Sequence, residues 1–172
     1  LKATAKTPYR LLQPIQSLSH GDEDASNMLI QGDNLEALKA LLPYYAGQVK
    51  CIFIDPPYNT KSAVSVHYDD NIEHAQWLSI IYPRLVLLRE LLAEDGSIWI
   101  TLDDNEAHYF KVIADQVFHR KNFVVEIAWQ KAFAKKNKAV ISGSHDHLFV
   151  YTKRKEIWKR NLVVRSPANI KS

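Results

Sequence analysis

The chain has 172 residues, 47% of them hydrophobic and 24% charged, which is the composition of an ordinary globular domain. No apolar run approaches the roughly 20 residues that a membrane-spanning helix needs, and no signal peptide is visible, so we expect a cytoplasmic protein. The single cysteine excludes an internal disulfide and fits a reducing compartment.

The formal net charge of +3 conceals two segments of opposite charge. Residues 1–120 carry ten Lys and Arg against sixteen Asp and Glu, a net charge of −6, whereas residues 121–172 carry twelve against three, a net charge of +9. A basic segment of this size favours contact with a polyanion such as DNA, although a solvated basic tail has the same composition.

The first 26 residues contain two prolines and a polar, acidic stretch, and we expect them to form an arm over the domain that follows. Residues 27–31 are expected to form a short strand. A helix should begin after Asp33, because leucines recur there at helical spacing, and Pro43 should mark its end. Asp33 is then the N-cap of this helix, a role worth about 1 kcal/mol.

The apolar run at residues 51–54 predicts a strand that is buried on both faces, as in a parallel sheet, and its cysteine should be a packed thiol. Asp55-Pro56-Pro57-Tyr58 follows directly, and the two prolines lack N–H donors, so they end the strand in a stiff turn. Ligands bind at the carboxyl ends of strands in open α/β sheets. The turn therefore presents a carboxylate and an aromatic ring at a binding position.

This pair of groups suits a planar base that carries an exocyclic amine. The Asp55 carboxylate and the Pro56 carbonyl can each accept one amine hydrogen, and Tyr58 can stack on the ring of a base that is flipped out of a duplex. The same four residues also fit a plain turn that ends a strand with a helix-capping acid, so the surrounding sequence has to decide.

The remaining elements follow from hydrophobic periodicity. After a polar loop at residues 59–71, we expect a helix over residues 72–92, which Pro83 should kink or split, and a buried strand over residues 97–102. The acidic run at residues 103–106 should open a helix that ends near Phe118. Its cap should be Asp104 or Asn105. Two further strands are expected at residues 123–130 and 145–152.

A basic segment separates the last two strands. Its lysines surround Phe133, which suits a nucleic-acid strand, and a surface loop without a ligand is an equal alternative. The lysines are Lys131, Lys135, Lys136 and Lys138. Metal binding has no support, because His145 and His147 share a strand face without a third ligand.

Taken in this order, the motifs resemble those of the amino-methyltransferases that modify adenine in DNA. The resemblance rests on Asp55-Pro56-Pro57-Tyr58, on residues 31–38 upstream, and on residues 95–100 and 103–106 downstream. Over residues 27–152, the chain is similar to the adenine-specific methylation subunits of type III restriction–modification systems. In these families D-P-P-Y separates adenine enzymes from the S-P-P-Y of many cytosine-N4 enzymes and the N-P-P-Y of RNA and protein methyltransferases.

The resemblance implies an α/β, Rossmann-like fold that depends on S-adenosylmethionine, with the catalytic domain at residues 27–152. Residues 1–26 then form the arm, and residues 153–172 a basic tail that leads to a target-recognition region. Double-stranded DNA is the implied partner, with a restriction subunit and a homodimer of the full-length enzyme as further candidates. The implied catalytic residues are Asp55, Pro56, Pro57 and Tyr58, the implied cofactor contacts are Asp33, Asn34 and Asp55, and the four lysines above are the candidate DNA contacts.

One motif expected from the resemblance is absent from the sequence. Such enzymes hold the methionine part of the cofactor on a glycine-rich turn, because glycine lets the backbone approach a ligand closely, yet no two of the five glycines lie within two positions of each other. We therefore expect an incomplete fold, a fragment with a base pocket and part of a cofactor pocket. Its strands at residues 27–31 and 51–54 should not be bonded to each other, and the second should be an uncovered edge.

Two other functions stay open. A non-catalytic DNA-binding or assembly remnant would keep the fold and the basic surface without the glycine-rich turn. A methyltransferase that acts on cytosine-N4 or on an RNA base would keep the turn chemistry with another substrate.

Overall fold

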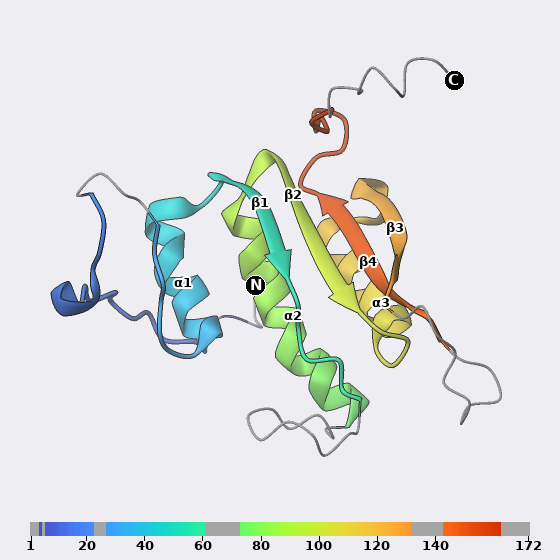
Figure 1. Ribbon diagram of the computed structural model, residues 1–172, viewed down its shortest axis with the longest axis horizontal. Helices are drawn as coiled ribbons and strands as arrows, with labels where there is room; N and C mark the ends of the chain where they lie inside the picture. Colours follow the sequence, from blue (N-terminus) through green and yellow to red (C-terminus); the bar gives the residue numbers. More distant parts are fainter. Residues whose placement is uncertain (1–3, 5, 23–26, 61–72, 132–142, 163–172) are drawn as a thin grey trace.

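The computed structural model describes residue 4 and residues 6–22, 27–60, 73–131 and 143–162 (Figure 1). In chain order, its elements are η1 (Gln16–Leu18), α1 (Asn34–Tyr45), β1 (Val49–Ile54), α2 (His74–Leu91), β2 (Leu92–Leu102), α3 (Ala107–Phe118), η2 (Arg120–Asn122), β3 (Phe123–Gln130) and β4 (His145–Thr152). None of the helices in these described ranges is long and apolar enough to cross a membrane.

The four strands form one mixed sheet in the order β1-β2-β4-β3. β1 and β2 are parallel, with Ile54 opposite Ile100, and β4 runs antiparallel to both β2 and β3. The carboxyl ends of β1 and β2 therefore lie side by side, next to the beginning of β4 (Figure 1). We call this the carboxyl end of the sheet. The mixed α/β architecture agrees with the predicted methyltransferase fold in its incomplete form.

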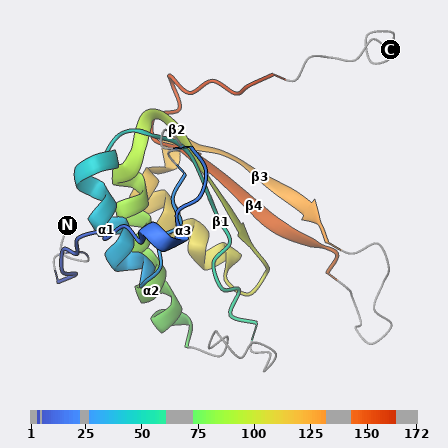
Figure 2. The ribbon, with the colours of Figure 1, turned by 60° about the vertical axis from the view of Figure 1, so that its left-hand side comes forward.

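All three helices α1, α2 and α3 lie on the same side of the sheet (Figure 2). α1 packs against α2, and α2 packs against α3. The core between these layers uses alternate residues of the strands, as the two-residue period of a strand requires. Fully buried core residues include Leu85, Ile98, Ile100, Leu102, Phe110, Phe118, Phe149 and Tyr151.

The other face of the sheet carries no helix among the described residues, and β1 shows the consequence. Ile52 is buried, but Cys51 is exposed and Phe53 has 63% of its surface exposed. The prediction that residues 51–54 are buried on both faces is therefore wrong, as is the packed thiol. An apolar run indicates a strand, but it does not say how many faces the rest of the chain covers. β1 lies at the edge of the sheet, as predicted.

Residues 27–31 do not form the predicted strand. Leu29 is 99% exposed, and no ladder joins this segment to the free edge of β1 in the described sheet. A strand needs a neighbour for its backbone N–H and C=O groups, and these residues lack one here. Since residues 27–31 form no strand, the expected separation of two strands by others between them stays a prediction.

Both prolines that were expected to end or break helices are accommodated. α1 continues past Pro43 to Tyr45, so the missing N–H falls in its last turn. α2 runs without division through Pro83, and Arg84 Nη1 donates to the Ile80 carbonyl at 2.6 Å in the turn where proline removes a backbone donor.

The beginning of α3 also differs from prediction, because neither Asp104 nor Asn105 caps it. The N-cap position is Glu106, which makes no side-chain capping bond. Asp103 Oδ1 instead accepts the Asn105 amide at 3.0 Å. Asp104 is engaged elsewhere, by His147 on β4.

The described part of the arm contacts α1. The Lys39 ammonium donates to the carbonyls of Thr4 and Thr7, and Arg10 Nε pairs with Glu36 Oε2 at 3.0 Å. The arm thus lies beside the helix that Asp33 begins.

Candidate active site

The motif turn, residues 55–58, follows β1 at the carboxyl end of the sheet. Asp55 continues the alternation of Cys51 and Phe53, so it belongs to the face without helices, and it is exposed. Pro56 is buried, and Tyr58 is half-buried and packs against the hydrophobic core. The turn thus combines an accessible carboxylate with an aromatic ring that the core supports.

A threonine on β2 holds the carboxylate of the turn. Thr101 Oγ1 donates to Asp55 Oδ1 at 2.6 Å. The Tyr58 phenol lies close enough to Thr101 and Asp55 for both to affect its pKa. Side chains from two neighbouring strand ends therefore gather at the carboxyl end of the sheet.

The environment of Tyr58 keeps its phenol protonated. Burial is the largest cause that raises its pKa, and the negative charges of Asp55 and Asp146 act in the same direction. A protonated phenol can donate a hydrogen bond to its neighbours at physiological pH, and it adds no negative charge to the site.

The turn is also held from α2 and from the beginning of α3. The indole Nε1 of Trp77 donates to the Pro57 carbonyl at 2.8 Å. Asn59 Nδ2 donates to Glu106 Oε1 at 2.7 Å, and the other oxygen of Glu106 lies 2.6 Å from His74 Nδ1. Glu106 is only 2% exposed, so one buried carboxylate joins the residue after the motif to the first residue of α2.

The backbone at Asn59 shows how sharply the chain turns there. Its φ of 57° lies in the left-handed region, which asparagine tolerates better than most residues. The bond to Glu106 holds this residue in place, and the chain leaves the motif in a fixed direction.

The implied cofactor residues lie at the beginning of α1. As predicted, Asp33 is the N-cap, and its Oδ1 accepts the amides of Leu35 at 2.9 Å and Glu36 at 3.2 Å. Arg84 on α2 contacts both residues, since its Nη2 lies 3.6 Å from Asp33 Oδ2 and its Nε donates to Asn34 Oδ1 at 2.6 Å. α2 therefore holds this acid as well as the motif turn.

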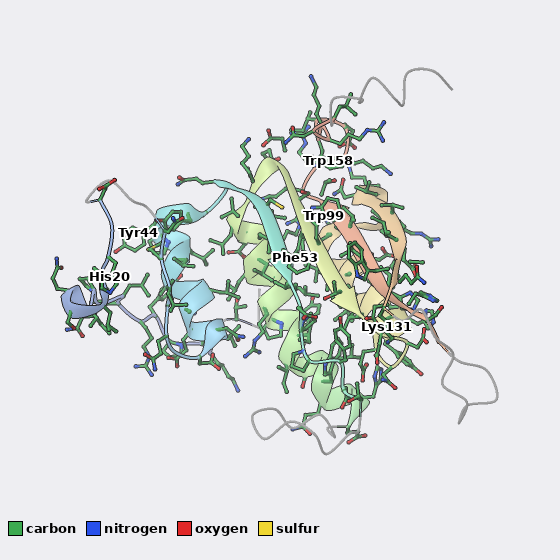
Figure 3. All side chains as sticks on the ribbon, viewed as in Figure 1. His20, Tyr44, Phe53, Trp99, Lys131 and Trp158 are labelled. Atoms are coloured by element: carbon green, nitrogen blue, oxygen red, sulfur yellow. The ribbon has the colours of Figure 1, made fainter. Side chains whose placement is uncertain are left out.

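One of the four candidate DNA-contact lysines lies within the described residues. Lys131 follows β3 and forms an ion pair with Asp146 at 2.6 Å (Figure 3). The charge of Asp146 also raises the pKa of Tyr58, so the first lysine of the basic segment lies at the same end of the sheet as the motif turn. Lys135, Lys136 and Lys138 lie outside the described residues.

The histidines of β4 take part in an ionic cluster that sequence reasoning did not find. His147 lies between Asp104 Oδ1, 2.8 Å from its Nε2, and Glu126, whose Oε1 lies 2.5 Å from its Nδ1. The centroid of the His147 ring also lies 5.2 Å from the ring centroid of His145 and 5.6 Å from the ring centroid of His108. Across the described ranges, no group of three or more His, Cys, Asp and Glu side chains is arranged to hold a metal ion.

His147 and Asp104 both have shifted pKa values. Burial alone would lower the pKa of His147, but its hydrogen bonds to Asp104 and Glu126 outweigh burial and raise it. The hydrogen bond from His147 lowers the pKa of Asp104. The imidazolium therefore ties the beginning of α3 to β3 and β4.

Sequence reasoning placed the motif turn correctly and missed the residues that support it. Thr101 and Glu106 lie 46 and 47 residues from their partners in the turn. Only their place in the sequence could have indicated these contacts. Thr101 lies at the end of β2, the next strand in the chain after β1, and Glu106 lies just after β2. Parallel neighbours bring such positions together at the carboxyl end of a sheet.

The fold is similar to that of a solved bacterial protein. The chain matches a Thermus thermophilus protein assigned as a DNA modification methylase, with a TM-score of 0.55 and 18% identity over 80% of this chain and 59% of that one. A second structure of that protein, in complex with S-adenosyl-L-methionine, gives a TM-score of 0.54 with 17% identity over 76% of this chain and 54% of that one. At this level of identity the likeness concerns the fold alone.

The sequence itself gives the family. Residues 49–168 match the family model described as DNA methylase, which covers the N6 and N4 enzymes. The chain therefore belongs to the N6/N4 DNA methylase family.

Individual relatives support the same assignment. The chain is 36% identical to the Mod subunit of the type III restriction–modification enzyme EcoP15I from Escherichia coli, over 82% of this chain and 27% of the relative. It is 32% identical to the type II methyltransferase M.KpnI from Klebsiella pneumoniae, over 83% of this chain and 36% of that protein. The chain thus spans only about a quarter to just over a third of the length of these two relatives.

Proposed function

We propose that this chain carries the catalytic motif of an enzyme that transfers a methyl group from S-adenosylmethionine to the exocyclic N6 amine of adenine in DNA. The observation that supports this proposal most is the motif turn, in which an exposed carboxylate and a supported aromatic ring lie together at the carboxyl end of the sheet. Membership of the N6/N4 family and the likeness to type III Mod subunits support the same substrate class.

The residues of the turn have complementary roles in this proposal. Asp55 and the Pro56 carbonyl accept the two amine hydrogens, which leaves the nitrogen lone pair free to form the new N–C bond. Tyr58 stacks on the flipped adenine. The lone pair of a neutral adenine amine is delocalised into the ring, so orientation and stabilisation of the positive charge that develops on nitrogen supply the rate enhancement. Asp55, directly or through water, receives the departing proton.

The cofactor would supply an electrophilic sulfonium methyl, and the electron pair of the broken S–C bond would stay on sulfur. Asp33 and Asn34 fit a contact with its adenosine part, because they lie at a helix N-terminus and Arg84 orients both side chains. The five glycines of this sequence provide no glycine-rich turn for the methionine part. We therefore propose that the complete cofactor pocket needs residues beyond these 172.

Double-stranded DNA is the proposed partner, and the basic segment that begins at Lys131 is its proposed contact. The lysines are candidates for phosphate contacts, which position DNA without reading its sequence. A restriction subunit is a further proposed partner, by analogy with the type III relatives.

The test is product analysis. The full-length enzyme that contains this segment would be incubated with labelled S-adenosylmethionine and unmethylated genomic DNA, and the digested nucleosides separated. N6-methyladenine as the labelled product, absent with Asp55→Ala, is the expected result. Labelled N4-methylcytosine would instead support the second substrate that the family accommodates.

A non-catalytic remnant is the alternative from another functional class, and the missing glycine-rich turn favours it. The two proposals differ in what the full-length enzyme does. DNA binding without methyl transfer by that enzyme, in the presence of a bound cofactor, would support the remnant.

A further inference from the structure

The hydroxyl of Thr101 lies where the two functional groups of the motif meet. Ile54 pairs with Ile100 in the parallel β1–β2 ladder, so the next residues, Asp55 and Thr101, lie side by side on the face without helices. Thr101 Oγ1 and Asp55 Oδ1 are 2.6 Å apart, which is the short distance expected for a hydroxyl that donates to a carboxylate.

The direction of this hydrogen bond follows from the protons of the two partners. A threonine hydroxyl has one proton and two acceptor lone pairs, whereas a carboxylate only accepts. Thr101 therefore donates to Asp55. The Tyr58 phenol lies beside this pair, and burial together with the charge of Asp55 raises its pKa and keeps it protonated.

We infer that Thr101 is a positioning residue for methyl transfer: its hydroxyl fixes the Asp55 carboxylate relative to the Tyr58 ring. The inference rests on the proposed function, in which the carboxylate holds the amine and the ring holds the base. With Oδ1 engaged by Thr101, Oδ2 is the oxygen that accepts the amine hydrogen. Asp55 is exposed, so without this bond its side chain can rotate among several rotamers, and misplacement of a reacting group by about 1 Å can cost about 10²-fold in rate.

The test compares two substitutions at Thr101 in the full-length enzyme. Thr101→Val keeps the β-branched shape and removes the hydroxyl, whereas Thr101→Ser keeps the hydroxyl. We expect Thr101→Val to lower the single-turnover rate of methyl transfer roughly tenfold or more, with the dissociation constants for DNA and cofactor unchanged. Thr101→Ser should restore most of the rate, which loss of strand packing alone would not predict.

Thr152→Val is the matched control. Thr152 lies on β4, opposite Ser97 and away from the carboxyl end, and its hydroxyl donates to the Asn122 carbonyl at 3.3 Å. The control should methylate at the wild-type rate. Thermal melting of each variant separates misfolding from lost positioning, and Thr101→Ser serves as the decisive variant if Thr101→Val does not fold.

Two outcomes would overturn the inference alone: an active wild-type enzyme with an equally active Thr101→Val variant, or a Thr101→Ser variant that is folded and as slow as Thr101→Val. A wild-type enzyme that binds cofactor and DNA without methyl transfer would overturn the proposed function, and this inference with it. The wild-type rate therefore distinguishes the two failures.

Discussion

In the proposed reaction Asp55 holds the base and Asp33 contacts the cofactor. The two acids differ in how many parts of the protein hold them in place. The turn of Asp55 receives hydrogen bonds from Thr101 on β2 and from Trp77 on α2, and Asn59 just after it donates to Glu106 at the beginning of α3. Asp33 caps α1 and contacts Arg84, but the residues before it form no strand and lie exposed.

This difference indicates which half of the proposed reaction these residues can organise. The proposed base-binding residues are held by contacts among β1, β2, α2 and α3, all of which lie within the described residues. In the proposed reaction the cofactor side would need a glycine-rich turn and a neighbour for the edge of β1 that is free in the described sheet, and this sequence contains no such turn. We therefore expect changes at Asp55 to affect chemistry and changes at the free edge of the sheet to affect cofactor binding and association.

The largest expected effect is that of Asp55→Ala in the full-length enzyme. Methyl transfer should fall by about 10²–10³-fold or more, since the amine loses a charged acceptor at the reacting atom, while cofactor affinity stays within a few-fold. Turnover is measured with labelled cofactor, and affinity by isothermal titration calorimetry.

Asp95→Ala is a matched control for this prediction. Asp95 lies near the opposite end of β2 and pairs with Lys50 at the surface, where an ion pair contributes little. This control should retain wild-type turnover. If Asp55→Ala keeps half of the wild-type turnover, the base role of Asp55 is wrong.

The second prediction concerns the 172-residue chain alone. We expect it to bind S-adenosylmethionine no better than millimolar and to self-associate, because β1 offers an unpaired edge with an exposed Phe53. Phe53→Lys should reduce self-association, since a charge on an edge strand opposes pairing. Light scattering measures association, and calorimetry measures affinity.

Tyr109→Lys is the control for Phe53→Lys. Tyr109 is also an exposed aromatic residue, but it lies on α3, and its substitution should leave association unchanged. A monodisperse wild-type chain with micromolar cofactor affinity would contradict the prediction and would show that the sheet needs no further strand at β1.

The sequence predicted the elements that depend on local chemistry. Asp33 caps its helix because its side chain reaches amides two and three residues ahead, and such a bond can be read from spacing. The motif turn lies at a strand end because two prolines cannot continue a ladder. The strands of the β3–β4 hairpin were likewise predicted where the structure places them.

Features that depend on distant partners were not predictable in the same way. Residues 27–31 have strand composition but find no neighbour, and β1 is apolar although one of its faces stays uncovered. Asp104 was expected to cap α3, but it bonds His147, 43 residues away. The contacts of Thr101 and Glu106 with the motif turn were not predicted for the same reason, since they exist only once β1, β2 and α3 are brought together.

The third prediction tests the basic segment against the motif turn. Replacing Lys135, Lys136 and Lys138 together with Gln should weaken DNA binding for all sequences. The slope of log K against log salt should fall by roughly 0.9 for every phosphate that loses its lysine. Lys131→Gln should change the slope less, because Asp146 already pairs with this lysine. An unchanged slope in the triple variant would mean that these lysines do not bind phosphates.

The fourth prediction separates the ring of Tyr58 from its hydroxyl. Tyr58→Ala should lose about 1–3 kcal/mol of base binding, the contribution of a stacked base. Tyr58→Phe should be mild, because it keeps the ring and leaves the Thr101–Asp55 bond in place. Binding is measured with the full-length enzyme and its DNA, and equal losses in the two variants would assign the effect to the hydroxyl.

The smallest effect concerns stability rather than chemistry, and it tests how the carboxyl end of the sheet is tied to the β3–β4 hairpin. The pKa of His147 is raised above its ordinary value of 6.5 by Asp104 and Glu126, so folding favours the protonated ring. This contribution is fully present below about pH 6.5 and declines as the pH rises through the raised pKa of the folded state. The pKa of Asp104 is lowered, so the contribution of Asp104 to the free energy of unfolding is lost as the pH falls through that pKa. The cluster therefore stabilises the fold most between the lowered pKa of Asp104 and the raised pKa of His147.

Denaturant unfolding measured from about pH 6 to about pH 8.5 checks this linkage. We expect the free energy of unfolding to fall with rising pH in the Phe53→Lys background, which limits association, and the fall to shrink when His147→Gln is added. The rings of His108 and His145 also face the His147 ring. His20→Gln on the exposed arm is the control and should leave the full dependence. If His147→Gln and His20→Gln behave alike, the cluster does not hold the hairpin to α3, and the beginning of α3 must be positioned by Glu106 and its partners alone.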